Sequence, residues 1–292
     1  MQILQAIALC SALALAAAAQ AQQVDWTKVD AAMGRNATVA GEVHRYGFPR
    51  SDLQVTLDGV TIKPPLALGG WVAFMPMRDH AMVMGDLVLL ETEVNSVMAK
   101  LLDGGLEITA IHNHLLRASP ATFYMHVGGM GDPVKMAEVI KTALAQSKTP
   151  PASPPPATPP AVDLDTAQLD QIIGAKGQAN GGVYQFNVPR RDPVTEGGMT
   201  IPTAMGSAHV INFQPTGGGK AAITGDFVLV ADEVMPMIRI LRSNGIDVTA
   251  MHSHMLSEQP RLIFMHYWAV DDAVKLAKSL RAGLDKTATA KP

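Results

Sequence analysis

The chain has 292 residues, 48% of them hydrophobic, which is enough to form the buried cores of two ordinary domains. Its 23 Lys and Arg residues against 26 Asp and Glu residues give a formal net charge of −3, and the charges are spread along the chain without long basic blocks. This pattern disfavours a nucleic-acid-binding surface, and we expect no nucleic-acid partner.

Residues 1–21 are typical of a cleavable signal peptide. The apolar run Ile7–Ala19 leads into Ala19-Gln20-Ala21, which supplies small residues at the −3 and −1 positions of a cleavage site. Lys and Arg are missing from the start of this segment, so only the α-amino group carries positive charge there. We expect a mature chain that begins at Gln22 and is periplasmic or secreted.

The single cysteine, Cys10, lies inside this segment. Leu9 before it is too large for lipoprotein cleavage, and the apolar stretch preceding it is too short. Cleavage after Ala21 leaves a mature chain without cysteine, which excludes disulfides and thiolate metal sites. Elsewhere the sequence has no run of ~18 apolar residues, so we expect no transmembrane segment in the mature chain.

A proline-rich segment separates two copies of one sequence. Ser147–Val162 holds seven of the 20 prolines, a composition that favours an extended, semi-rigid linker. GDLVLLETEV (85–94) matches GDFVLVADEV (225–234), and LEITAIHNHLL (106–116) matches IDVTAMHSHML (246–256), both at an offset of 140 residues. We therefore expect a repeat domain at 24–146, a linker at 147–162 and a second repeat domain at 163–287.

Helix signals stand at matching places in the two repeats. Short helices are predicted at Val24–Met33 and Leu164–Ile173. An apolar stripe from Val94 to Leu101 predicts an amphipathic helix that ends at Gly104-Gly105, where glycine suits a left-handed cap. Asp132-Pro133 supplies an N-cap and a first-turn proline for a helix that continues to about Gln146.

Between these helices lie segments that alternate or run apolar like strands. They are Asp52–Ile62, Trp71–Met77, Met82–Leu90, Glu107–Leu115 and Thr122–Val127. The predicted fold class is α+β, a tandem duplication of a domain with a mostly antiparallel sheet and flanking helices.

Three histidines in each repeat have the spacing of a metal site. His112 and His114 are two residues apart on a predicted strand and so share a face. His126 follows on the next strand with Pro120 midway, and a symmetric hairpin would place His114 directly opposite it, with Cβ atoms ~4.5–5.5 Å apart. The second repeat has the same spacing. The predicted metal ligands, one site per repeat, are His112, His114, His126, His252, His254 and His266.

Three neutral imidazoles with a water in the fourth position are typical of catalytic zinc, so Zn²⁺ is the expected divalent metal. Copper is the less favoured alternative, suggested by the methionines that adjoin the histidines, because thioethers are soft ligands. However, Met125 and Met265 should face away from the neighbouring histidines, so core filling explains them better. The alternative without metal is that the histidines are core residues, but converging imidazoles would then each need a hydrogen-bond partner.

The sequence assigns no catalytic residue. Acidic candidates for a general base or for contacts to the ligands are Glu42, Asp86, Glu93, Glu107, Asp226, Glu233, Asp247 and Glu258. Arg50 and Arg190 could bind a substrate carboxylate, but the Pro-Arg-x-Asp context favours a salt-bridged structural corner.

Other polar motifs have simpler interpretations. Gly217-Gly218-Gly219-Lys220 lacks the spacing and the following helix of a phosphate-binding loop and predicts a turn. His44, His80 and His209 have no counterpart in the other repeat and are interpreted as surface or local residues.

The chain resembles the LppY/LpqO family of exported bacterial proteins of unknown function. The resemblance is carried by FPRSDLQVTLDG, MVMGDLVL, ITAIHNHLL, NFQPTGGGKAAITGDFVL and RLIFMHYWAVDDAVKLA, and it covers nearly the whole mature chain. A more distant likeness is to acetolactate decarboxylase and related zinc domains, which implies zinc at the six histidines. Tyr124-Met125 and Phe264-Met265 replace that enzyme's glycine pair, so its substrate and reaction are not implied.

We interpret the chain as an extracytoplasmic metal-binding protein. It could act as a hydrolase or lyase on a small oxygen-rich substrate through a metal-bound water. Two alternatives stay open: a noncatalytic periplasmic carrier of a metal or ligand, and a cell-envelope interaction module whose linker lets two domains engage two sites. The sequence leaves the oligomeric state undetermined.

Overall fold

The computed structural model describes residues 24–78, 80–154, 158 and 160–290. The predicted signal peptide, its cleavage site and Cys10 lie outside these residues. Within them, no helix is long and apolar enough to cross a lipid bilayer.

The first repeat forms a six-stranded antiparallel sheet with helices on one face. The strand order is β1-β2-β5-β6-β8-β7, and a small β3–β4 ribbon with helix α2 is inserted between β2 and β5. The elements are α1 (Trp26–Met33), β1 (Thr38–Ala40), β2 (Val43–Pro49), β3 (Thr56–Leu57), β4 (Val60–Thr61), α2 (Pro64–Ala67), β5 (Gly69–Met77), β6 (His80–Leu90), α3 (Glu91–Asp103), β7 (Glu107–His112), β8 (Thr122–Gly131) and α4 (Pro133–Leu144).

The second repeat has the same topology, with strand order β15-β16-β14-β13-β10-β9. Its elements are α5 (Thr166–Ile173), β9 (Gln178–Asn180), β10 (Val183–Pro189), β11 (Thr195–Glu196), β12 (Met199–Thr200), the 3₁₀ helix η1 (Thr203–Met205), β13 (Ala208–Gly217), β14 (Lys220–Leu229), α6 (Ala231–Ser243), β15 (Asp247–His252), β16 (Ile263–Asp272) and α7 (Ala273–Leu284). The predicted α+β tandem duplication is confirmed.

Local sequence signals explain where the helices begin and end. The Asp132 side chain accepts hydrogen bonds from the backbone N–H groups of Val134 (2.9 Å) and Lys135 (3.1 Å), and this cap starts α4 as predicted. After α3, Gly105 takes the left-handed conformation (φ 81°), whereas Gly104 does not (φ −86°). The predicted glycine cap is therefore formed by the second glycine of the pair.

Two strand predictions were wrong in extent. Residues 52–62 form the β3–β4 ribbon instead of one strand, because Asp58 and Gly59 both take positive φ (47° and 80°) and reverse the chain. Strand β7 ends at His112 instead of Leu115, and the chain then leaves the sheet. The interpretation of Gly217–Lys220 as a turn is confirmed, since these two residues pair across the β13–β14 hairpin.

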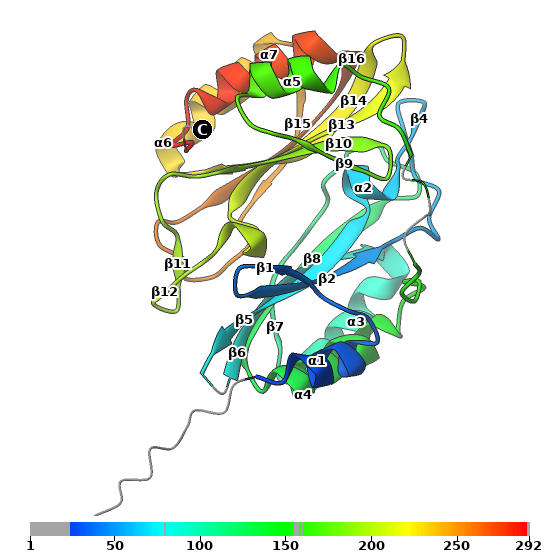
Figure 1. Ribbon diagram of the computed structural model, residues 1–292, viewed down its shortest axis with the longest axis vertical. Helices are drawn as coiled ribbons and strands as arrows, with labels where there is room; N and C mark the ends of the chain where they lie inside the picture. Colours follow the sequence, from blue (N-terminus) through cyan, green and yellow to red (C-terminus); the bar gives the residue numbers. More distant parts are fainter. Residues whose placement is uncertain (1–23, 79, 155–157, 159, 291–292) are drawn as a thin grey trace, which may run out of the picture.

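The two repeats pack sheet against sheet in four layers, with helices on both outer faces (Figure 1). Two apolar clusters lie between the sheets, and each contains residues from both repeats. One joins Val43, Ala73, Met75 and Met82 to Val194, Met205, Val228 and Phe264; the other joins Leu57, Leu66, Val88 and Tyr124 to Val183, Ala222 and Trp268. This buried apolar contact makes the repeats one body, which does not fit the interpretation that the linker lets two separate domains engage two sites.

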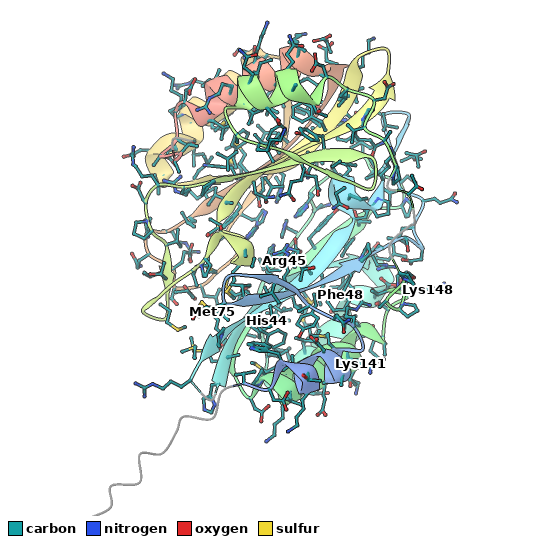
Figure 2. All side chains as sticks on the ribbon, in the orientation of Figure 1. His44, Arg45, Phe48, Met75, Lys141 and Lys148 are labelled. Carbon is teal, nitrogen blue, oxygen red and sulfur yellow. The ribbon has the colours of Figure 1, made fainter. Side chains whose placement is uncertain are left out.

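Alternation along β2 shows the two faces of the first sheet (Figure 2). His44 faces the helices and stacks on Trp26, with ring centroids 3.6 Å apart. Arg45 faces the second repeat, where it donates a hydrogen bond to the carbonyl of Ala204 (2.7 Å) and lies over the Trp71 ring. The inner face of the sheet therefore carries polar as well as apolar contacts between the repeats.

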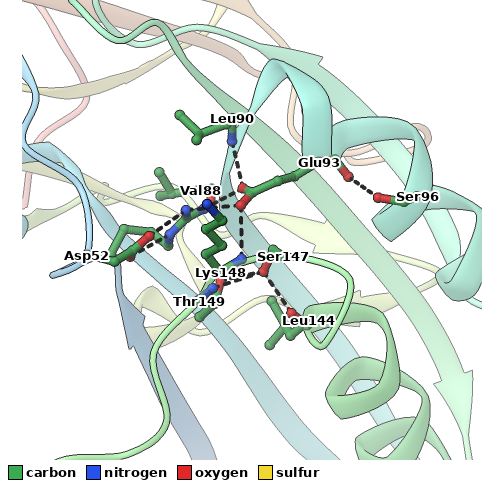
Figure 3. Close-up of polar contacts among 10 residues, drawn as sticks. Asp52, Val88, Leu90, Glu93, Ser96, Leu144, Ser147, Lys148 and Thr149 are labelled. Carbon is green, nitrogen blue, oxygen red and sulfur yellow. Dashed lines mark hydrogen bonds and ion pairs between the residues drawn. The ribbon is translucent and has the colours of Figure 1, made fainter.

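Arg50 forms a buried structural corner, and Figure 3 shows its partners Asp52, Val88 and Glu93. Its fully buried guanidinium donates to Glu93 (2.7 Å), to both carboxylate oxygens of Asp52 and to the carbonyl of Val88. The Glu93 carboxylate also accepts from the backbone N–H groups of Leu90 and Lys148, both at 2.9 Å. Arg190 repeats the arrangement with Glu233 and the carbonyl of Val228. Both arginines are occupied by structural partners, so the corner interpretation is confirmed.

His209 is buried, although the sequence indicated a surface or local residue. Its Nδ1 accepts a hydrogen bond from the backbone N–H of Val228 (3.0 Å), which holds the neutral ring between β13 and β14. Burial, together with the charges of Arg190 and Arg281, lowers the pKa of His209 from 6.5 to about 3.

The pKa of His209 predicts a specific acid sensitivity. The unfolded chain takes up a proton at this position below pH 6.5, whereas the folded chain does not, so the contribution of His209 to stability falls as the pH drops from 6.5 towards 3. His209→Asn keeps an acceptor for the Val228 N–H but cannot titrate. Between pH 7 and pH 5, the native chain should lose about 2 kcal/mol more unfolding free energy than His209→Asn, measured by urea denaturation. Equal losses would contradict this account.

Candidate metal centre

Each repeat carries two of its three histidines on sheet strands and the third just beyond the end of a strand. His126 lies on β8, where its strand neighbours are Ala110 of β7 on one side and Asp86 of β6 on the other. His112 of β7 pairs with Tyr124 of β8. The predicted pairing of His114 with His126 was wrong. The His112–Tyr124 pair puts the middle of the hairpin two residues before Pro120, and β7 ends at His112, so His114 lies beyond the strand.

The histidines of the two repeats meet in the middle of the molecule as three stacked pairs. Ring centroids are 3.4 Å apart for His112 and His252, 3.7 Å for His114 and His266, and 3.8 Å for His126 and His254. Within a repeat the nearest histidine rings are 4.9 Å apart. The geometry is therefore one joint cluster, in place of the two separate trios that the sequence predicted.

Two symmetric hydrogen bonds hold the histidine segments against the opposite repeat. Thr109 Oγ1 donates to the carbonyl of His254, and Thr249 Oγ1 donates to the carbonyl of His114, both at 2.6 Å. Thr109 and Thr249 occupy the bulges of β7 and β15. The bulge of each repeat thus supplies the contact that positions the histidine segment of the other repeat.

Four of the imidazoles are close enough to share one ion. Ligand atoms of His112, His252, His254 and His266 all lie within 4.8 Å of one another. His252 Nε2 and His266 Nε2 are 2.7 Å apart. The set takes one histidine from the first repeat and three from the second, so it exists only when the repeats are packed together.

Asp86 and Asp226 are the acidic candidates that reach this cluster. Asp86 lies 3.8 Å from the Nε2 atoms of both His114 and His126. Asp226 lies 3.7 Å from His254 Nε2 and 3.9 Å from His266 Nδ1. Glu93 and Glu233 bind the buried arginines, and Glu258 accepts from the backbone N–H of Leu262. Glu42 is exposed, and Asp247 pairs with Arg242.

The cluster is built to be neutral at its histidines. Burial lowers the pKa of His252 to about 4 and of His266 to about 3, and it lowers the pKa of the other four well below 6.5. Burial also raises the pKa of Asp86 to about 7, against the opposing effect of Arg45, and raises that of Asp226. Neutral imidazole is the form that binds a metal ion.

Several buried polar atoms of the cluster lack a hydrogen-bond partner. They are both ring nitrogens of His112, Nε2 of His114, His126 and His254, and Oδ1 of Asp86 and Asp226. Each such atom costs about 1–3 kcal/mol when its desolvation is not compensated. The nitrogens could coordinate a cation bound among them, and its positive charge would compensate the negative charge of the buried carboxylates. The residues present therefore fit a transition-metal ion.

The prediction that the methionines next to the histidines fill the core is confirmed for some of them. Met125 and Met265 are fully buried on the helix-facing sides of the sheets, as core residues. Met255 is buried between the repeats, and Met251 is about half exposed.

Comparisons with known proteins place the chain in a family without assigning an activity. Two solved structures have a low similarity over most of the chain: a trimeric bacterial microcompartment shell protein, PduB (12% identity, 86% of this chain, 89% of that chain, TM-score 0.22), and EtuB from Clostridium kluyveri (10% identity, 86% and 90%, TM-score 0.20). At these TM-scores neither likeness informs the fold or the function. A search of curated proteins found no match. The sequence profile of a Domain of Unknown Function (DUF1259) matches residues 27–146 and again residues 167–286, so the chain belongs to that family and contains its domain twice.

Proposed function

We propose that this chain is a metal-binding protein whose two repeats together hold a transition-metal ion. The observation that carries the proposal is the set of buried, unpartnered nitrogens on His112, His114, His126 and His254. Neutral imidazoles bind zinc in proteins at ~2.0–2.1 Å, and four of them complete a tetrahedral site. Judged on the imidazoles alone, Zn²⁺ is the first candidate, and copper is compatible with the same ligands.

A catalytic role, as a metal-dependent hydrolase or lyase on a small substrate, is the second candidate. It is favoured by Asp86 and Asp226, whose Oδ1 atoms have no partner and lie 3.8 and 3.9 Å from histidine nitrogens of the cluster. A carboxylate beside a metal ligand can take a proton from metal-bound water. Water-proton relaxation of the paramagnetic Co²⁺-substituted protein distinguishes the two roles. A catalytic site should show a water that exchanges at the ion, whereas a chain that only binds metal should show none.

The likeness to acetolactate decarboxylase-type zinc domains falls on the same six histidines and adds support for a metal. The resemblance to the LppY/LpqO family adds the expectation of export. Neither adds a substrate.

Elemental analysis of the full chain, purified without an affinity tag or added metal, tests the proposal. We expect about one ion per chain, and we expect a chelator to lower the unfolding free energy by about 2.7 kcal/mol for an ion present at 100 times its Kd. Fewer than about 0.2 ions per chain after zinc incubation, with no effect of chelator on melting, would refute metal binding.

Export remains a proposal that rests on the first 21 residues. Chain recovered from its host should begin at Gln22, as read by N-terminal sequencing. An intact Met1 or an acylated Cys10 would contradict it.

A further inference from the structure

A cavity of about 320 Å³ opens beside the histidine cluster on one side of the molecule. It lies between the β6–β8–β7 edge of the first sheet and two segments of the second repeat. Its lining is Met82, Val83, Met84, Gly105, Glu107, Thr109, Val127, Gly128, Gly129 and Met130 from the first repeat, with Glu196, His254 and Met255 from the second.

His254 connects this cavity to the cluster. The residue is only 8% exposed, its Nε2 has no hydrogen-bond partner, and it lines the cavity. The same ring stacks on His126 at 3.8 Å, and its Nε2 is 3.7 Å from Asp226. A small solute in the cavity therefore meets a ligand of the proposed metal centre directly.

The lining has the chemistry of a cation site. Glu107 and Glu196 bring two carboxylates, and Glu196 Oε2 is buried without a partner. No lysine or arginine occurs among the described residues that line the cavity, so the local charge favours a cation over an anion. Four methionines supply thioethers, which are soft ligands that prefer Cu⁺ to Zn²⁺, Mg²⁺ or Ca²⁺.

The equivalent place on the other side of the molecule is filled. Trp268 stands there at the position of Gly128, Leu115 at that of Met255, and Leu57 at that of Glu196. All three replacements are at most 4% exposed. The indole N–H of Trp268 donates to Asp58 (3.0 Å), which fixes the ring. The two repeats have therefore diverged at these positions, and among the described residues a cavity lies beside the cluster on one side where the equivalent place on the other holds large buried side chains.

We propose that the methionine-lined cavity is the port through which a soft metal cation, Cu⁺, reaches the histidine centre. The inference rests on the proposed function, because the port has a purpose only if the centre binds metal. The thioethers bind the ion transiently in the port. The ion then passes to the imidazoles, of which His254 binds it first. The carboxylates attract the ion, and its charge and oxidation state do not change during the transfer.

Gly128→Trp tests the port by copying the closed side. A Cβ atom at Gly128 would have Thr109 Cγ2 as its nearest neighbour at 3.5 Å, an ordinary contact, so the backbone accepts a side chain there. Metal-free full-length chain is mixed with Cu⁺ supplied from a coloured weak chelator, and the loading rate is followed by absorbance. We expect Gly128→Trp to slow loading of both Cu⁺ and Zn²⁺ by about tenfold or more, with the final stoichiometry unchanged.

Replacing Met84 and Met130 together by leucine tests the role of the thioethers. Leucine keeps the volume but removes the soft ligand, so Cu⁺ loading should slow by about threefold or more while Zn²⁺ loading keeps its rate. The matched control is Met235→Leu, a half-exposed methionine on α6 outside the port, which should change neither rate.

The outcomes distinguish a failure of the port from a failure of the metal centre. Unchanged loading in Gly128→Trp would overturn the port while the metal centre stood. Equal slowing of Cu⁺ and Zn²⁺ in the methionine double variant, or no slowing of Cu⁺, would overturn the preference for a soft ion. If the unmodified chain took up neither metal, the proposed function itself would fail.

Discussion

Replacing His252 by alanine should abolish metal binding by the whole chain instead of halving it. His252 stacks on His112 of the first repeat at 3.4 Å, and its Nε2 lies 2.7 Å from His266 Nε2. It is one of the four imidazoles that can share an ion. Because the ligands come from both repeats, losing this ring disrupts the shared centre, and we expect the affinity to fall by about 100-fold or more.

Metal stoichiometry and melting with and without chelator measure this effect. His252→Ala should retain little metal after gel filtration, and chelator should no longer lower its melting temperature. His44→Ala is the control, because His44 stacks on Trp26 on the helix side of the sheet and should bind metal like the native chain. Two independent trios, as the sequence alone suggested, would leave the first repeat loaded and about half of the metal bound. That result would contradict the joint centre.

Much of the fold could be predicted because its signals are local. The cap at Asp132 and the glycine that ends α3 depend on residues a few positions apart, and the duplication is visible because whole strings recur 140 residues later. The error at residues 52–62 has a local cause as well: the Asp58-Gly59 reversal was present in the sequence but was counted as part of an apolar run. A turn dipeptide inside a strand pattern should have divided it.

The site was predictable in its residues but not in its arrangement. The His-x-His pattern and the third histidine depend on strand alternation within one repeat, which sequence shows. The stacking of His126 on His254 joins residues from different repeats and depends on how two sheets pack, which periodicity does not encode. The bulge at Thr109 shifts the register by one residue and has no clear sequence signal.

Asp86 and Asp226 could have been singled out from the eight acidic candidates. Both follow a glycine at the same position of the two repeats, in GDLVL and GDFVL. They lie opposite His126 and His266 across the sheet. Pairing the predicted strand 82–90 with the strand that carries His126 would have placed the first carboxylate beside the histidines. The sequence predicts only the hairpin between the strands at 107–115 and 122–127.

Gly225→Ala should be among the most destabilising single-methyl changes in the chain. A Cβ atom there would lie 2.0 Å from the backbone oxygen of Val210 and 2.7 Å from the hydroxyl of Tyr267. The buried Tyr267 side chain crosses over Gly225 and donates to that same oxygen (3.3 Å), so neither neighbour can move without breaking strand contacts. We expect a loss of about 3 kcal/mol or more of unfolding free energy, measured by urea denaturation of metal-free protein.

Two other strand glycines serve as comparisons, because the space for an added Cβ atom differs between them. At Gly85, the equivalent position in the first repeat, a Cβ would meet a Val72 methyl group at 2.6 Å and the Trp71 oxygen at 2.7 Å. At Gly47 it would meet nothing within 4 Å, so alanine there should be neutral or stabilise by up to about 1 kcal/mol. The expected order of destabilisation is Gly225, then Gly85, then Gly47. Gly225→Ala as stable as Gly47→Ala would contradict the close packing of β13, β14 and β16.

The same substitution should also weaken metal binding, through a positioning effect. The carbonyl of Gly225 accepts a hydrogen bond from His266 Nδ1 (2.8 Å), which leaves Nε2 directed at the cluster. Shifting this carbonyl tilts the imidazole, so we expect metal affinity to fall by about 10–100-fold in the fraction of Gly225→Ala that remains folded. Gly47→Ala should bind metal like the native chain. Titration with a competing chelator under conditions where both variants are fully folded separates this loss from instability, because only a displaced ligand weakens binding in the folded state.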